Sequence, residues 1–255
     1  MQKAKLLLDR FIADAQTVFG QRIQAIYKIG SLGSHGDFSL CSDVDVALFL
    51  DEVRDADFEK VQTLWDSLKQ SGLAYADRLS VFWSGSPEQF NQGVGRFPAL
   101  DRLDLLQHGI LLEGKDLRDN FAMPSHQAVV LESKAFIHSF MLTPEKQEEL
   151  QENPEAILQK GTRYFTKFVL FPVRLIFTLD HPGILGSNQD AVKHYYTTWH
   201  KEVPEAFELI KFAYEARMHA AHEPVVYDLQ PLQAALLPLY DYCVKRYQEA
   251  ACPTP

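Results

Sequence analysis

The chain has 255 residues, of which 46% are hydrophobic and 23% are charged. This length suffices for one large domain or two modest ones, and the composition favours a packed core over intrinsic disorder. The formal net charge of -9, without any dense run of Lys and Arg, disfavours nucleic acid as a partner and favours a small molecule.

The apolar segments and the cysteines indicate the compartment. The three cysteines are odd in number and have no metal-site spacing. The apolar run at residues 6–8 is too short for a signal peptide. The most apolar stretch, residues 168–177, contains Pro172 and Arg174 and falls short of the ~20 residues that a membrane span needs. We therefore expect a soluble, cytoplasmic protein with reduced thiols and no membrane partner.

The first half of the chain alternates between helical and strand patterns. Apolar spacing predicts helices and period-two alternation predicts strands. Glycines at positions 20, 72 and 114 mark the ends of three of these elements. In chain order the predicted elements are a helix at 2–19, strands at 23–29 and 43–50, a helix at 55–71, a strand at 77–83, a loop at 86–98, a short helix at 99–108 and a strand at 110–113.

The second half has a different character. Apolar residues recur at helical spacing through 130–142, 155–179, 189–199, 204–221 and 229–249, with prolines between or near the ends of these segments. We interpret this pattern as four or five helices packed in a bundle. The predicted boundary lies near Pro124, which gives domains at 1–124 and 125–255.

A Gly-Ser turn followed by two acids carries the strongest chemical signal. Gly30 and Ser31 follow the strand at 23–29, and after eleven residues come Asp43, Val44 and Asp45. Strand alternation places both carboxylates on one face, about 7 Å apart, where they can share the divalent ions that bind phosphates. An Asp-x-Asp pair alone is common on the polar face of a strand, but the strand–turn–strand context favours a functional site.

The turn itself suits a phosphate group. Gly30 lets the backbone approach phosphates closely, since it has no side chain. Ser31 offers a hydroxyl and a backbone N–H at a possible helix start, where anions bind favourably. Positioning and charge neutralisation dominate nucleotide transfer, so these four residues are candidates to hold a nucleoside triphosphate.

Residues 26–50, IYKIGSLGSHGDFSLCSDVDVALFL, resemble the signature of the DNA-polymerase-beta-like nucleotidyltransferase superfamily. Gly30, Ser31, Asp43 and Asp45 match that pattern position by position. The layout is also similar to two-domain enzymes that adenylylate antibiotics, such as the streptomycin and kanamycin nucleotidyltransferases. The resemblance implies an α+β fold, with a small mixed β-sheet nucleotidyltransferase domain at 1–124 followed by a C-terminal α-helical bundle at 125–255.

The same resemblance implies the reaction. The expected activity is Mg²⁺-dependent transfer of a nucleoside monophosphate, AMP from ATP, to a hydroxyl of a small-molecule acceptor, with release of pyrophosphate. ATP would be the co-substrate, and two Mg²⁺ ions would be held by acidic side chains that include Asp43 and Asp45.

Further site residues follow from the resemblance. The family uses a third acid to complete the metal site or to act as general base, and Asp77 is our candidate, with Asp104 and Glu113 as alternatives. Arg174 lies in a segment that resembles the helix from which streptomycin enzymes offer an Arg to the nucleotide, although a surface ion pair is an alternative. Lys193 is a candidate phosphate contact or an ordinary exposed lysine.

The acceptor and two other functions stay open. Residues 156–179 contain no Asp or Glu but four Lys and Arg, which departs from enzymes that bind polycationic antibiotics and leaves a neutral or anionic acceptor, a protein or a tRNA end. One alternative is a toxin–antitoxin nucleotidyltransferase that modifies a macromolecule. Another is a ribonuclease, because Arg217 and His222 resemble the Arg-x(4–6)-His element of HEPN-type enzymes.

Overall fold

The computed structural model describes residues 2–33, 38–219 and 226–250. The chain divides into two compact units. The first, here the sheet unit, comprises Met1–Phe38 and Ser42–Pro124, and the second, the helical unit, comprises Ser39–Cys41 and Ser125–Pro255. The first contains a mixed four-stranded sheet and the second is largely helical, which confirms the expected α+β class.

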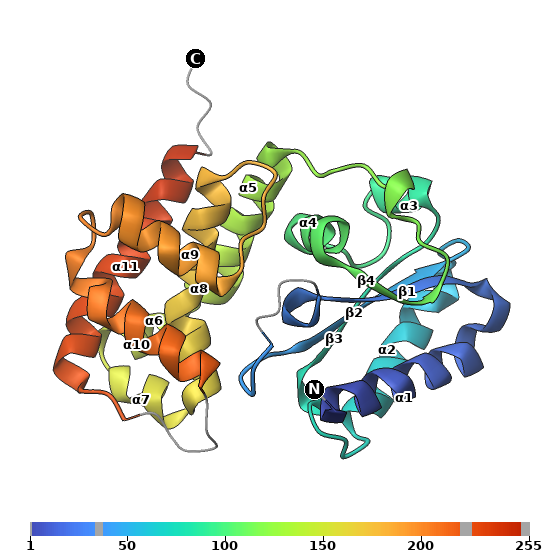
Figure 1. Ribbon diagram of the computed structural model, residues 1–255, viewed down its shortest axis with the longest axis horizontal. Coiled ribbons are helices and arrows are strands. Elements are labelled where there is room, and N and C mark those ends of the chain that lie inside the picture. The colour runs from blue at the N-terminus through green and yellow to red at the C-terminus, as the bar shows by residue number, and fades with distance from the viewer. Residues whose placement is uncertain (1, 34–37, 220–225, 251–255) are drawn as a thin grey trace. The chain divides into compact units, whose positions relative to one another are not determined.

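The sheet has the strand order β3-β2-β1-β4 (Figure 1). Its strands are β1 (Ile23–Ile29), β2 (Val44–Leu50), β3 (Leu79–Ser84) and β4 (Ile110–Gly114). β1 pairs antiparallel with both β2 and β4, whereas β2 and β3 are parallel. The parallel pair needs a crossover, which α2 supplies between the two strands.

Helices cover both faces of this sheet (Figure 1). Helices α1 (Gln2–Phe19) and α2 (Asp55–Lys69) pack on one face, and α3 (Pro87–Asn91) and α4 (Ala99–His108) pack on the other. Side chains alternate along β2, so Val46 joins the first core and Ala47 joins the second. By the same alternation Asp45 belongs to the face that α4 covers.

The starts of two strands and the content of one loop differ most from the sequence prediction. β2 and β3 begin one and two residues later than expected, at Val44 and Leu79. A 3₁₀ turn, Ala76–Arg78, precedes β3 because Tyr75 takes a left-handed conformation with φ of 69°. The expected loop at 86–98 contains α3, which begins where the Ser86 side chain accepts a hydrogen bond from the Gln89 N–H and a proline occupies the first turn.

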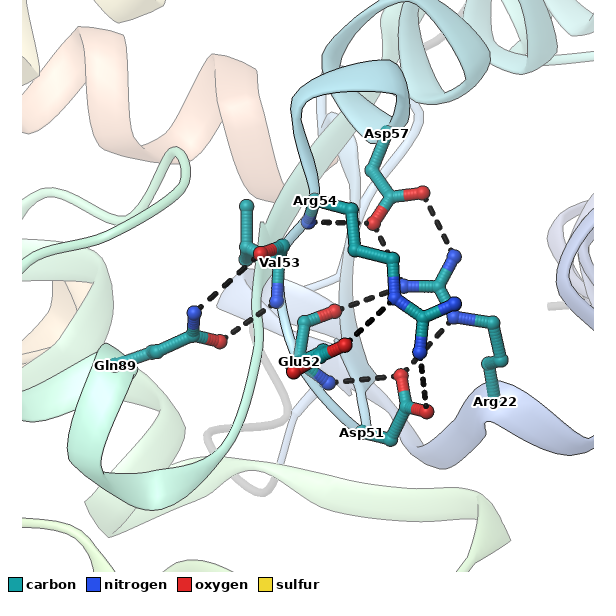
Figure 2. Close-up of polar contacts among 7 residues, drawn as sticks. All are labelled: Arg22, Asp51, Glu52, Val53, Arg54, Asp57 and Gln89. Carbon is teal, nitrogen blue, oxygen red and sulfur yellow. Dashed lines mark hydrogen bonds and ion pairs between the residues drawn. The ribbon is translucent and has the colours of Figure 1, made fainter.

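An ion-pair network closes the C-terminal end of β2 (Figure 2). Arg22 donates to both carboxylate oxygens of Asp57, each at 2.8 Å, and to Asp51 at 3.0 Å. The Asp57 side chain is only 1% exposed, and hydrogen bonding from Arg22 holds the pKa of this carboxyl below its usual range. Gln89 of α3 accepts from the Val53 N–H and donates to the Val53 carbonyl, so the loop between β2 and α2 is held from both sides.

The helical unit is built around one long apolar helix, α8 (Thr162–Asp180), which packs against α9, α10 and α11. Most of its side chains are buried, which explains its continuous hydrophobic sequence. The other helices described are α5 (His126–Phe136), α6 (Pro144–Gln151), α7 (Pro154–Gln159), α9 (Asn188–His194), α10 (Phe207–Met218) and α11 (Leu229–Ala250), with π-helical segments at Ile137–Met141 and Tyr195–Trp199.

The sequence analysis expected fewer and longer helices in this unit than the structure describes. The predicted helix at 155–179 is two helices, α7 and α8, because Gly161 between them takes a φ of 89°. Helix α6 was not predicted, and it begins where Thr143 accepts a hydrogen bond from the Lys146 N–H and Pro144 occupies the first turn. Pro172 lies inside α8, so this proline does not end the helix.

The helices of residues 2–33, 38–219 and 226–250 include none that is long and apolar enough to cross a membrane. Cys41 and Cys243 are buried, and burial raises the pKa of the Cys243 thiol to about 12. Cys252 lies outside the described residues.

Candidate active site

The Gly-Ser turn is packed so tightly that its glycines have no room for side chains. Gly30 follows β1 in the left-handed region, with φ of 65°, and opens a 3₁₀ turn over Gly30–Leu32. The Gly33 N–H closes this turn by donating to the Gly30 carbonyl at 2.9 Å. A Cβ on Gly33 would lie 2.6 Å from the carbonyl oxygen of His108 at the end of α4. The sequence therefore needs glycine at both positions.

Asp45 lies directly against this turn. It occupies the second position of β2, opposite Ile29 of β1 and Ser80 of β3, and it is half-buried. A Cβ built on Gly30 would come within 2.5 Å of a carboxylate oxygen of Asp45. The carboxylate thus occupies the space beside the Gly30 Cα, and strand pairing explains the contact because β1 leads straight into the turn.

A second carboxylate, from α4, contacts the same glycine. Asp104 of α4 is 4% exposed, and its Oδ2 accepts a hydrogen bond from the Gly30 N–H. A carboxylate that accepts a backbone N–H makes a charge-assisted bond, which fixes the turn against α4. The sequence analysis gave Asp104 only as an alternative third acid. Gly30 and Asp104 are 74 positions apart, and no local sequence pattern predicts a contact between residues so far apart.

The acids predicted for the metal site are arranged less compactly than expected. Asp43 is half-buried and immediately precedes β2, two positions from Asp45. Asp77 lies in the 3₁₀ turn before β3, where its side chain is 76% exposed and 3.6 Å from Arg78. Glu113 is exposed on β4 opposite Ile26. Within the described parts of the chain no group of three or more His, Cys, Asp and Glu side chains is placed to hold a metal ion.

The strand next to β2 presents a hydroxyl beside Asp45. Ser80 is the β3 residue paired with Asp45, and paired residues of neighbouring strands project from the same face. Ser80 is half-buried, as Asp45 is. The sequence analysis did not single out Ser80, since the register between two strands cannot be read from either strand alone.

The remaining predicted residues lie on helices of the helical unit. Arg174 is half-buried on α8, and its Nε is buried without a hydrogen-bond partner among the described residues. Lys193 is exposed on α9. Arg217 of the ribonuclease hypothesis lies on α10 and donates to the Thr166 hydroxyl at 3.4 Å, whereas His222 lies outside the described residues.

Comparison with known proteins finds similarity among solved structures. No family model matches the sequence, and no curated protein matches it. Among solved structures, the chain is similar to spectinomycin adenyltransferase AAD(9) from Enterococcus faecialis, whose structure contains ATP and spectinomycin. The TM-score is 0.65 at 14% sequence identity, and the match covers 96% of this chain and 99% of the other. At this identity the match shows that the two chains share a fold over nearly their whole lengths.

Proposed function

We propose that the protein is a nucleotidyltransferase that transfers AMP from ATP to a hydroxyl of a small-molecule acceptor. The acceptor oxygen would bond to the α-phosphorus while the bond to the leaving pyrophosphate breaks. Support comes from a fold similar to that of an adenyltransferase and from the sequence signature on Gly30, Ser31, Asp43 and Asp45. The structural observation that carries the proposal is the contact of the Asp45 carboxylate with the Gly30 turn.

The donor set fits Mg²⁺. Magnesium in proteins is commonly held by one or two carboxylates together with substrate phosphates, and it does not need an all-protein cage. Asp45 offers a carboxylate against the turn and Asp43 lies two positions before it, so we assign both as the ligands for the expected two ions. When bound, the metal would neutralise negative charge on the nucleotide phosphates. We do not include Asp77 in this set, because its exposed carboxylate lies beside Arg78.

Gly30 and Ser31 have different proposed roles in the turn. The N–H of Gly30 is already donated to Asp104, so Asp104 is a positioning residue that holds the turn in place. The contribution of the turn to the phosphates would then come from the hydroxyl and N–H of Ser31, which is half-buried at the start of the 3₁₀ turn. Arg174 and Lys193 are proposed as further phosphate contacts.

The direct test is calorimetric titration of ATP into the wild type and into the Asp43→Asn/Asp45→Asn variant, with and without Mg²⁺. The proposal expects binding by the wild type that depends on magnesium and is lost in the variant. Failure of the wild type to bind any nucleoside triphosphate would overturn it. A labelled-ATP screen against hydroxyl-bearing small molecules would then identify the acceptor.

A further inference from the structure

A cavity of about 270 Å³ in the helical unit has a lysine on its wall. We propose that Lys146 is a covalent binding site, at which a small aromatic aldehyde forms an imine with the side-chain amine. The cavity walls come from the π-helical segment Ile137–Met141 and from α6, α8 and α11. The site lies within one unit of the chain and does not involve the Gly30 turn.

Aromatic side chains predominate in the lining, which includes Phe140, Tyr164, Phe168, Phe171 and Tyr240. Phe140 and Phe171 meet edge to face, with ring centroids 6.1 Å apart. Phe168 stacks on Tyr240 at 5.1 Å, and the Tyr240 hydroxyl donates to the Phe168 carbonyl at 2.9 Å. These rings favour a planar aromatic ligand, and the volume suits a single ring because drug-sized ligands occupy larger pockets.

The amine of Lys146 is held against one of these rings. Its nitrogen lies 3.2 Å from the centroid of the Phe140 ring and donates to the Phe140 carbonyl at 2.6 Å. This hydrogen bond uses a single N–H, so an uncharged amine can make it and still keep a lone pair for attack. A nucleophile held beside the surface that binds a ligand reacts with that ligand faster than a freely moving one does.

Two lysines of the helical unit differ in the surroundings of the amine. Lys146 is half-buried, and burial lowers its pKa, with Glu149 acting in the opposite direction and Lys167 lowering the pKa again. Lys160 is exposed and forms ion pairs with Glu149 and with Glu145, and the hydrogen bond to Glu149 raises the pKa of Lys160. The uncharged, nucleophilic amine is therefore more accessible for Lys146 than for Lys160.

Imine formation needs no reagent besides the aldehyde. The Lys146 ammonium loses a proton to water, and the nitrogen lone pair attacks the aldehyde carbon. A C–N bond forms, the C=O bond breaks, and the oxygen leaves as water with the two protons of the amine. Proton uptake from water then gives a protonated imine, whose N–H can still be donated to the Phe140 carbonyl while the ring of the ligand lies among the aromatic side chains.

The first test measures which lysines react in the wild-type chain. Benzaldehyde is added with cyanoborohydride, which reduces each imine to a stable amine, and peptide mass spectrometry gives the labelling rate at each lysine. Propanal, an aldehyde without a ring, is the matched probe. We expect benzaldehyde to label Lys146 at least about tenfold faster than the exposed Lys160 and Lys211, and propanal to show a preference of at most about threefold. Equal rates at the three lysines, or the same preference with both aldehydes, would overturn the proposal.

The second test asks whether the reaction takes place in the aromatic cavity. Benzyl alcohol has the ring but cannot form an imine, and an excess of it should slow the labelling of Lys146 by benzaldehyde at least about fivefold without affecting Lys211. Propanol at the same concentration is the control and should protect neither lysine. Labelling of Lys146 that benzyl alcohol does not slow would overturn the proposal.

The third test uses conservative variants that keep the positive charge. In intact-protein mass spectrometry Lys146→Arg should lose the fast phase of labelling by benzaldehyde, and Lys160→Arg should retain it. A fast phase that persists in Lys146→Arg would overturn the proposal. If this variant does not fold, the rates and the competition measured on the wild type decide. No nucleotide or metal is added, so the result is independent of the proposed transferase activity.

Discussion

The two ends of strand β2 use acidic residues in different ways. At the C-terminal end, Asp51 and the nearby Asp57 are both held by Arg22, so negative charge is balanced by a guanidinium within hydrogen-bond distance (Figure 2). At the N-terminal end, the carboxylates of Asp45 and Asp104 converge on the glycine turn that follows β1. The arginine-neutralised cluster holds the fold together, whereas Asp45 at the tight turn is one of the oxygen ligands that we propose for Mg²⁺.

The largest expected effect separates chemistry from stability at the N-terminal end. Asp45→Asn should lower the rate of AMP transfer roughly a thousandfold, about 4 kcal/mol in transition-state free energy, because it removes a proposed metal ligand. The rate is measured as pyrophosphate release with any hydroxyl acceptor that the wild type uses. Urea denaturation of the same variant checks that the fold is retained. Full activity in the folded variant would contradict this assignment.

The second largest effect concerns Arg22, which holds the acids at the C-terminal end of β2. Arg22→Met should lower the unfolding free energy by about 3 kcal/mol, because it leaves the buried carboxylate of Asp57 without its guanidinium. Urea denaturation measures the change. The control is Arg54→Met, whose side chain is 51% exposed and pairs with Glu52, and which should lose less than about 1 kcal/mol. Equal losses in the two variants would show that burial of Asp57 does not matter.

The same pair predicts how stability depends on pH. The pKa of Asp57 is lower in the folded chain than the value of about 3.9 for an unpaired aspartate. The resulting stabilisation is fully present above that value and is lost as the pH falls through the lowered pKa of the folded state. Between about pH 5 and pH 2 the wild type should lose roughly 2 kcal/mol more than Arg22→Met. Parallel pH profiles in denaturant melts would contradict the prediction.

Two glycines with positive φ separate the effect of backbone strain from the effect of the contact with Asp45. Gly30 and Gly20 both have positive φ, at 65° and 55°, but a Cβ on Gly20 would meet nothing within 4 Å. Ala substitution at each position adds backbone strain, and only Gly30→Ala also displaces the Asp45 carboxylate. We expect Gly30→Ala to cost about 1 kcal/mol more stability than Gly20→Ala and to weaken magnesium-dependent ATP binding. Thermal melts and calorimetry measure both, and identical behaviour would exclude the contact with Asp45.

The smallest expected effect concerns the third acid. Asp77→Asn should change the transfer rate by less than about twofold, because this side chain is exposed and lies beside Arg78. The variant is assayed beside Asp45→Asn. A loss as large as that of Asp45→Asn would place Asp77 in the site and would require the turn before β3 to move on nucleotide binding.

The sequence was most informative where a feature depends on neighbours in the chain. The Gly30 turn and the two strands that flank it could be predicted because they carry a local pattern. The start of β3 was misplaced, because Tyr75 takes a left-handed conformation and a 3₁₀ turn follows it. The Asp104 contact and the pairing of Ser80 with Asp45 could not be predicted, because both depend on tertiary packing and strand register.

The most direct test of the account compares the two ends of β2 in one experiment. Electron paramagnetic resonance measures how much Mn²⁺ is bound in the presence of ATP by the wild type, by Asp45→Asn and by Asp51→Asn. These two variants remove the same charge from opposite ends of the same strand. We predict that Asp45→Asn loses nucleotide-dependent Mn²⁺ binding and that Asp51→Asn retains it. Equal binding by both variants, or equal loss in both, would contradict a cation site at the Gly30 turn.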